Sequence, residues 1–300
     1  MNSSGLTQNS SGQPEIPGLN PDDEPEGDDV DGGAGDLLLS PSSVIAYMSD
    51  PARYYFKKIL KRRESSGKAA IEGSTYHAGI EFALNHKKQM GQLPPLPDTL
   101  EFVSAFWKAE TRKLPIGTRP NDDRLEYVKG FFMSQIYDTI APIEPKMIEE
   151  EVRAPISPGL KLRGFIDLVH TKAPGADPKF DPRTDVLMDF KSKAASPPKD
   201  SSTGEYVMGN YDRFQLTLYA WMLSGGNYSV KSKIIYLVKN KVPKIVTTEI
   251  TISAEEQRRR LKTVVSVANA IRAGHFPPNY GHWLCAPDRC AFFKECHELL

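Results

Sequence analysis

Hydrophobic positions along the chain follow two different spacings, and the change comes near residue 145. Before it, apolar side chains recur every three or four residues, which predicts helices near residues 72–89, 97–113 and 122–140. After it, apolar and polar residues alternate, as they do along a half-buried strand. The pattern therefore predicts a helical region followed by a sheet.

The alternating half contains five predicted strands. They cover residues 146–156, 160–170, 184–193, 231–240 and 243–252. A turn at residues 157–159 joins the first two strands as a hairpin, and helices are predicted at residues 211–223 and 253–272. This order of elements is typical of a mixed α/β domain with an N-terminal helical region packed on it.

Two shorter helices are predicted before residue 72. Ser40 and Pro41 suit a helix start, and Pro51 should end that helix or begin another. The second short helix carries the aromatic run Tyr54-Tyr55-Phe56 and ends in a basic cluster. An aromatic run is thus expected beside positive charge.

Charge is distributed unevenly although the formal net charge is zero. Residues 1–36 hold nine of the 38 acidic residues and none of the 38 basic ones, so the remainder has 29 acidic residues and a net charge of +9. The same segment is rich in Ser, Gly, Asn and Pro, and it is predicted to be a disordered acidic tail. A basic body favours a polyanionic partner. The tail is either a solubilising leader, which we favour, or a competitor of nucleic acid for that body.

The remaining composition predicts a soluble protein. A hydrophobic content of 39% with 9% aromatic residues suffices for a core. The N-terminus lacks the basic-then-apolar pattern of a secretory signal, and no apolar run has the length of a membrane span. Three cysteines within residues 285–296 do not make a secreted disulfide framework. The expected location is the cytoplasm, with no membrane partner.

The third predicted strand ends in two charges. Alternation puts Asp189 and Lys191 on one face, whereas Val186, Met188 and Phe190 share the other. Desolvating a carboxylate and an ammonium at the end of a buried strand is costly unless something uses them. A surface salt bridge is the simpler interpretation of this pair taken alone.

The two preceding strands supply further carboxylates. Asp167 lies in the second strand, and alternation places Glu150 of the first strand on the side of Ile148 and Val152. Carboxylates that converge in one sheet repel each other unless a cation joins them, and Mg²⁺ or Mn²⁺ prefers oxygen ligands. Lys191 would then hold an attacking water or stabilise charge on a phosphate.

Four short motifs follow one another in a recognisable order. They are Gly73-x3-His77, Gly164-x2-Asp167, Asp189-x-Lys191 and Gln215-x3-Tyr219. With them the chain resembles the PD-(D/E)xK nuclease superfamily over residues 38–298, and within it the RecB-like exonucleases with their CRISPR-associated and phage relatives. The resemblance implies a restriction-endonuclease-like core, and one domain that follows the tail. Its parts would be a helical part at 37–144, a nuclease core at 145–274 and a cysteine-containing segment at 275–300.

The resemblance also implies roles for single residues. The metal ligands would be His77, Asp167, Asp189 and the backbone carbonyl of Phe190, and the metal Mg²⁺ or Mn²⁺. Lys191 matches the catalytic lysine.

Other positions carry weaker implications. Gln215 and Tyr219, one helical turn apart, match the motif that positions DNA near the site. Glu150 would be a further catalytic carboxylate, although three adjacent glutamates leave its register open. Glu81, one turn beyond His77, is expected to be structural or solvent-facing.

The cysteines suggest a second centre near the C-terminus. Cys285, Cys290 and Cys296 lie close enough in sequence for a metal or a cluster. Iron–sulfur members of the resembled group carry a fourth cysteine upstream, and Asp50 stands at that place here. Three alternatives remain open: a 4Fe–4S cluster, a zinc site completed by Asp50, His282 or His297, and three free thiols.

The expected function is that of a metal-dependent DNA exonuclease acting in recombination, repair or phage DNA processing. Its partner would be DNA, as single-stranded or duplex ends, beside proteins of recombination or replication. Candidate stacking residues are Tyr54, Tyr55, Phe56 and Trp283. The alternatives are a structure-specific or restriction-type endonuclease of the same fold, and a catalytically silent DNA-binding subunit.

Overall fold

The computed structural model describes residues 36–62, 68–173, 175, 177 and 179–299. Its strands are β1 (Leu37–Leu39), β2 (Pro145–Ser157), β3 (Leu160–Thr171), β4 (Asp185–Lys193), β5 (Val230–Val238) and β6 (Lys244–Ile252). Its α-helices are α1 (Pro41–Ser49), α2 (Pro51–Tyr54), α3 (Lys68–Met90), α4 (Leu96–Arg112), α5 (Asp122–Phe131), α6 (Tyr137–Ile140), α7 (Asn210–Ser224), α8 (Ala254–Arg272) and α9 (Phe293–Leu299). Shorter helical turns are η1 (Tyr55–Ile59), η2 (Ile116–Thr118) and η3 (Phe132–Ile136).

The six strands form one mixed sheet. One path through it has the order β1-β3-β4-β5-β6, and β2 pairs along the opposite edge of β3. The β2–β3 and β5–β6 pairs are antiparallel, whereas β4 and β5 are parallel and are joined by the crossover helix α7. The three strands with the candidate carboxylates are therefore direct neighbours.

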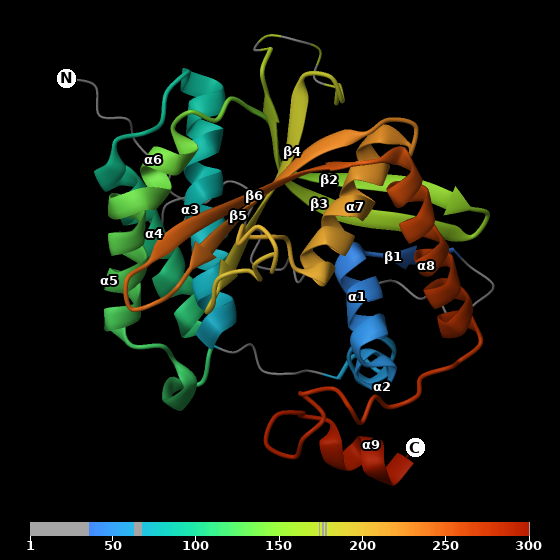
Figure 1. Cartoon of the computed structure of the whole chain (residues 1–300). Coiled ribbons are helices and arrows are strands. Elements are labelled where there is room, and N and C mark those ends of the chain that lie inside the picture. Colours follow the sequence, from blue (N-terminus) through green and yellow to red (C-terminus); the bar gives the residue numbers. More distant parts are fainter. Residues whose placement is uncertain (1–35, 63–67, 174, 176, 178, 300) are drawn as a thin grey trace, which may run out of the picture.

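A hydrophobic core lies on each face of the sheet. Helices α1, α7 and α8 cover one face around residues such as Leu218 and Ile234, and we call this the α7 core. Helices α3 to α6 cover the other face around residues such as Trp107 and Met188, and we call this the α3 core. Figure 1 shows the two groups of helices on opposite sides of the strands. The mixed α/β architecture is confirmed.

Most predicted elements are present with shifted ends. The five predicted strands and the long helices differ from the observed ones by at most four residues at either end. The predicted helix at 122–140 is divided into α5, a π-helical turn and α6. Among the described strands and α-helices, β1 and α9 were not predicted, because segments of three and seven residues are too short to show a period. The short turn η2 was not predicted either. The predicted tail, apart from Asp36, lies outside the described residues.

The first helices begin where their caps predict. The Ser40 hydroxyl accepts from the Ser43 backbone N–H at 3.1 Å, and Ser40 N–H donates to the Ser43 hydroxyl at 2.8 Å. This reciprocal pair is a capping box. Asp50 ends α1 and caps α2, because its Oδ1 accepts from the Arg53 N–H at 3.1 Å. The predicted restart at Pro51 is confirmed.

The C-terminal segment, residues 276–299, packs against α2 and η1 through a small core. Its buried members are Ala52, Phe56, Phe292 and Cys296, and we call this the C-terminal core. Phe56 stacks on Phe292 with ring centroids 5.3 Å apart. Among the described helices, none is long and apolar enough to cross a membrane.

Candidate active site

Side-chain alternation reverses in the middle of the β2–β3 hairpin. In β3, Ile166 packs in the α7 core, but Leu168, two residues further on, packs in the α3 core. In β2, Val152 contacts the α7 core and Ile148 belongs to the α3 core. The two reversals coincide, because Ile148 pairs with Leu168 and Glu150 pairs with Ile166.

Glu149 lies at this reversal. Its φ of 46° is in the left-handed region, which residues other than glycine rarely adopt. The hairpin register is the same on both sides of it, so Glu149 lies opposite Asp167. Backbone strain of this kind persists only where the surrounding structure holds it, and it is frequent at functional sites.

Glu150 does not converge with the other carboxylates. The prediction that it shares the side of Ile148 and Val152 is wrong, because the reversal at Glu149 separates those two residues onto opposite faces. Glu150 instead lies 3.4 Å from Lys88 Nζ, with 45% of its side chain exposed. Glu149 occupies the place that was expected for Glu150.

His77 of α3 completes a three-residue group with Glu149 and Asp167. Its Nδ1 lies 3.5 Å from Glu149 Oε1 and 3.7 Å from Asp167 Oδ2. The three donor atoms are within 4.8 Å of one another, which is close enough for one metal ion. Burial lowers the pKa of His77, but the Glu149 hydrogen bond and the charges of Asp167, Glu149 and Asp189 outweigh it and raise the pKa to about 9. The group therefore favours positive charge at this place.

Asp189 and Lys191 of β4 lie beside this group. The Phe190 backbone N–H donates to Asp167 Oδ2 at 3.0 Å, which joins β4 to the carboxylate of β3. Lys191 Nζ lies 2.9 Å from each carboxylate oxygen of Asp189. Asp189 is 2% exposed, and its Oδ2 accepts no hydrogen bond from any described residue. Burial and the Asp167 charge raise the pKa of Asp189 to about 7 although Lys191 opposes the rise, so the neighbouring ammonium offsets burial only in part.

Two motif glycines make room for neighbouring side chains. A Cβ on Gly164 would lie 2.7 Å from Tyr219 Cε1, and a Cβ on Gly73 would lie 3.2 Å from Ser192 Oγ. Gly164 thus lets Tyr219 pack on the strand that carries Asp167. Gly73 lets α3 approach the end of β4, so both glycines have a packing reason to be there.

Gln215 and Tyr219 share one face of α7, as their spacing predicts. Gln215 Nε2 donates to the Tyr219 hydroxyl at 2.9 Å. Burial and the charge of Asp189 raise the pKa of Tyr219, so the phenol stays protonated. The pair lies on the α7 side of the carboxylates, and its role toward DNA stays a prediction.

His77 and Glu149 face a cleft of about 500 Å³ between α3 and β4. Lining residues include His77, Glu81, Glu149 and Lys191. Burial and the charge of Glu149 raise the pKa of Glu81 to about 7, although His77 opposes the rise. Sequence reasoning did not select Glu149, and it expected Glu81 to be structural or solvent-facing. The His77-x3-Glu81 spacing was a usable signal for Glu81, because it puts both side chains on one helix face.

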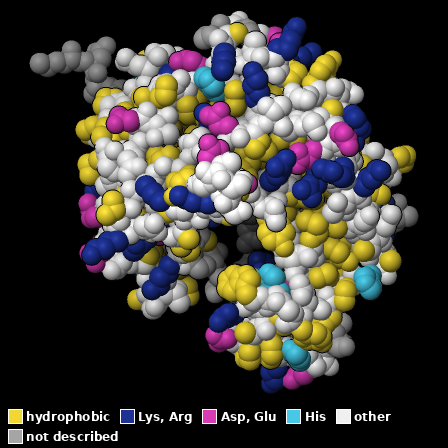
Figure 2. Space-filling view, viewed as in Figure 1, with side chains coloured by type: hydrophobic (Ala, Val, Ile, Leu, Met, Phe, Trp, Pro, Cys, Tyr) yellow, Lys and Arg dark blue, Asp and Glu magenta, His cyan; other side chains and the backbone are white. Residues whose placement is uncertain are grey.

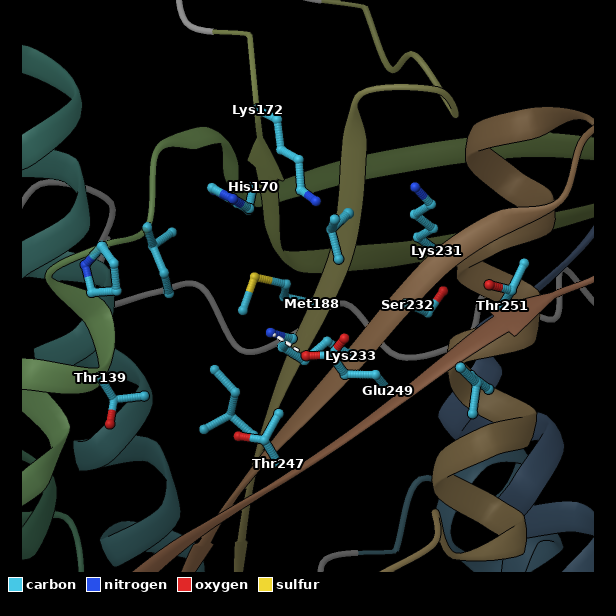
Figure 3. Close-up of a pocket in the computed structure, with 15 residues that line it drawn as sticks. Thr139, His170, Lys172, Met188, Lys231, Ser232, Lys233, Thr247, Glu249 and Thr251 are labelled. Atoms are coloured by element: carbon cyan, nitrogen blue, oxygen red, sulfur yellow. Dashed lines mark ion pairs between the residues drawn. The ribbon is translucent and has the colours of Figure 1, made fainter.

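Figure 3 shows a larger cavity, of about 660 Å³, on another part of the sheet. Lysines gather around it, and Met188 contributes to an apolar floor. Its acidic lining residue, Glu249, is paired with Lys233 at 2.6 Å. The residues described around this cavity include none of the candidate metal ligands, so cavity size does not identify the site of chemistry.

The predicted cysteine centre is brought together by the fold. Cys285, Cys290, Cys296 and Asp50 line one small pocket between α2 and the C-terminal segment, and His297 lines it as well. The cysteines form no disulfide. Burial and the charge of Asp50 raise the pKa of Cys285 and Cys296, so these thiols stay protonated in the metal-free protein.

Comparison with known proteins agrees with this geometry. The family model of the PD-(D/E)XK nuclease superfamily matches residues 38–297. A crystal structure of a candidate exonuclease from Eubacterium rectale superposes with a TM-score of 0.52 at 12% identity, covering 88% of each chain, which shows a shared fold. No curated protein matches by sequence. On the extent of the family match, the chain belongs to the PD-(D/E)XK nuclease superfamily.

Proposed function

We propose that this nuclease is a metal-dependent DNA exonuclease that hydrolyses phosphodiester bonds in the His77 cleft. The observation that carries the proposal is the meeting of His77, Glu149 and Asp167 within 4.8 Å, beside the buried Asp189–Lys191 pair. We further propose that residues 37–300 act as one nuclease domain, in DNA processing for recombination, repair or phage replication. The superfamily and the described neighbour support a nuclease, and the free-end requirement is our inference.

The donor atoms suit a hard divalent cation. Glu149, Asp167 and Asp189 supply carboxylate oxygens. The buried Oδ2 of Asp189 lies 2.9 Å from Lys191 Nζ but accepts no hydrogen bond from a described residue. His77 adds an imidazole nitrogen, which Mn²⁺ tolerates better than Mg²⁺ does. The carbonyl of Phe190 is a further candidate ligand. A bound ion would neutralise phosphate charge and lower the pKa of a water.

Lys191 is suited to stabilise charge rather than to take up a proton. Burial lowers its pKa, but Asp189 and Asp167 outweigh that effect and raise it, so the ammonium stays charged. Its side chain lines the cleft and is 20% exposed, which allows contact with a phosphate oxygen. A fixed positive charge that faces a phosphate stabilises the charge that develops during in-line attack.

We expect the site to position DNA through its phosphates, without contacts that read the base sequence. Gln215 and Tyr219 lie on the α7 side of the carboxylates. Figure 2 shows Lys and Arg side chains spread over the face in view. Phosphate contacts of this kind give affinity that falls with salt and carries no base preference.

A cleavage assay with end-labelled DNA tests the proposal. Linear and covalently closed circular DNA, single-stranded and duplex, are incubated with Mg²⁺, Mn²⁺ or EDTA. We expect mononucleotides or short products from linear DNA with either metal, none with EDTA, and intact circles. Cutting of closed circles would instead identify an endonuclease, and no cleavage of any substrate would favour a silent binding subunit.

We also propose that Asp50 and the three cysteines hold an iron–sulfur cluster. These four residues line one small pocket between α2 and the C-terminal segment. Three thiolates and one carboxylate could each bind one iron atom of a 4Fe–4S cluster.

Metal analysis tests the cluster. Protein purified without air should contain iron and sulfide and be brown, and Asp50→Cys should retain the colour longer, because thiolate is a softer donor than carboxylate. Cys290→Ser should lose the colour while DNA cleavage in the His77 cleft persists. Colourless anaerobic protein without iron would contradict the cluster and show that the thiols are ordinary packed side chains.

A further inference from the structure

A second groove lies where η1 meets the C-terminal segment, away from the carboxylates. It measures about 290 Å³. Arg53, Lys57 and Lys58 line it from the α2–η1 side, and His282 and Trp283 line it from the C-terminal side. Figure 2 shows the molecule hollowed where the C-terminal segment approaches the body.

Trp283 is the exposed aromatic residue of this groove. The predicted stacking residues Tyr54 and Phe56 are each 1% exposed and belong to hydrophobic cores, and Tyr55 packs on Phe276 with ring centroids 4.9 Å apart. Trp283 is 67% exposed. Its indole is therefore the aromatic face of this groove that a ligand can reach.

The backbone below Trp283 is anchored although the side chain is exposed. Its carbonyl accepts from Arg289 at 3.1 Å, and Asn279 Nδ2 donates to the Ser49 carbonyl of α1 at 2.8 Å. The Cys285 N–H donates to the His282 carbonyl at 2.8 Å, which closes a turn around Trp283. Because the backbone is held in this way, binding a ligand needs to order little more than the indole side chain itself.

Basic side chains outnumber acidic ones in the lining of the groove. Arg53, Lys57 and Lys58 line it, and Lys61 and Arg62 are exposed just beyond η1. The acidic lining residue is Asp50, which is buried and caps α2. Cations beside an exposed aromatic ring match a strand whose bases are unstacked and whose phosphates are charged. Duplex DNA offers the phosphates but not a free base face.

We propose that this groove binds single-stranded DNA, with one base stacked on Trp283 and the adjacent phosphates at Lys57 and Lys58. The inference rests on the proposed nuclease function only for the identity of the nucleic acid. The larger cavity of Figure 3 is also basic, but the residues that line it include no Trp, Tyr or Phe, so it lacks a large stacking partner.

Intrinsic fluorescence can read this contact directly. The chain has three tryptophans: Trp107 is buried, Trp221 is half-buried and Trp283 is exposed. Titration of the full chain in EDTA with an oligothymidylate should quench the emission, because a stacked base quenches indole. A blunt duplex of equal length should quench much less.

Trp283→Ala should abolish most of the quench and weaken oligothymidylate binding, measured by anisotropy, by about tenfold, within the range expected for loss of one stacked base. Lys57→Ala should weaken binding and reduce the slope of log affinity against log salt by about one phosphate contact. Tyr228→Ala is the matched control, because Tyr228 is 59% exposed but does not line this groove. It should bind as the wild type does.

Unchanged single-strand binding by Trp283→Ala, with the melting temperature of the wild type, would overturn the proposal. So would equal quenching by the duplex. The two proposals fail separately. If a single strand quenches the emission of a protein that cleaves no DNA, the groove proposal stands and the exonuclease proposal is contradicted. If the protein cleaves duplex DNA but a single strand does not quench it, the groove proposal is contradicted and the nuclease stands.

Discussion

The His77 cleft and the Trp283 groove are supported by hydrophobic cores of very different size. The cleft lies between α3 and β4. Its candidate ligand carboxylates are on three hydrogen-bonded strands of the sheet that separates the α7 and α3 cores. The C-terminal core behind the groove has four buried residues. Rigid strands hold charges at fixed distances, whereas a small core opens at low cost. Chemistry is therefore expected in the first region and strand binding in the second.

The largest effect should come from Asp189→Ala. Loss of this carboxylate removes a proposed metal ligand and the partner of Lys191, so we expect cleavage to fall by at least about a thousandfold. The fold should persist because the surrounding strands keep their cores. Cleavage rates with Mn²⁺ and single-strand fluorescence quenching, measured on one preparation, check this. Retained cleavage would exclude Asp189 as a ligand, and loss of quenching as well would show that the two regions are coupled.

A paired substitution tests the reversal of alternation. Glu149→Gln should lower cleavage by about a hundredfold and weaken Mn²⁺ binding, because Glu149 faces Asp167 and His77. Glu150→Gln is its matched control and should cleave at close to the wild-type rate, since Glu150 contacts Lys88 at the surface. Calorimetric Mn²⁺ titration separates ligand loss from unfolding. If Glu150→Gln had the larger effect, Glu150 rather than Glu149 would face the site, as simple alternation predicts.

Glu149 and Glu150 also show which parts of the site could be predicted from the sequence alone. Periodicity sufficed for the strands, and motif order singled out His77, Asp167 and Asp189, which the fold brings together. Among three adjacent glutamates, however, period-two alternation picks Glu150, and only a residue with positive φ exchanges it for Glu149. The i, i+4 spacing places Glu81 on the His77 face of α3, but its position in the cleft depends on the packing of α3 on the hairpin. The same limit applies to Trp283, whose exposure depends on contacts between segments far apart in sequence.

The third prediction concerns pH in the cleft. His77 has its pKa raised from 6.5 to about 9 in the metal-free fold, so its stabilising charge is fully present below pH 6.5 and is lost as pH rises toward 9. The free energy of unfolding in EDTA should fall over that range by at most about 3 kcal/mol. His77→Gln should flatten the fall above pH 7, where Glu81 no longer contributes. Urea titrations at pH 6.5, 7.5 and 9 measure it.

Metal binding gives the same residue a second readout. An ion displaces the proton from the His77 imidazole, so Mn²⁺ affinity should rise with pH between 6.5 and 9. The groove has no such dependence in the proposal, and single-strand quenching should vary little over that range. A flat stability profile in the wild type would contradict the charged state of His77.

The smallest effect is expected from Cys296→Ala. Cys296 is 9% exposed and packs with Phe56 and Phe292, so trimming its sulfur should cost about 1 kcal/mol locally. Because the C-terminal core is small, this loss should appear as faster hydrogen exchange in residues 279–299 with β4 unchanged. Single-strand affinity should fall slightly, because Trp283 depends on that segment for its position, while duplex cleavage stays the same. A cluster at the cysteines would enlarge the effect to several kcal/mol in anaerobic protein and leave it small in protein that has lost its iron. Equal exchange changes in β4 would show that the C-terminal segment supports the cleft after all.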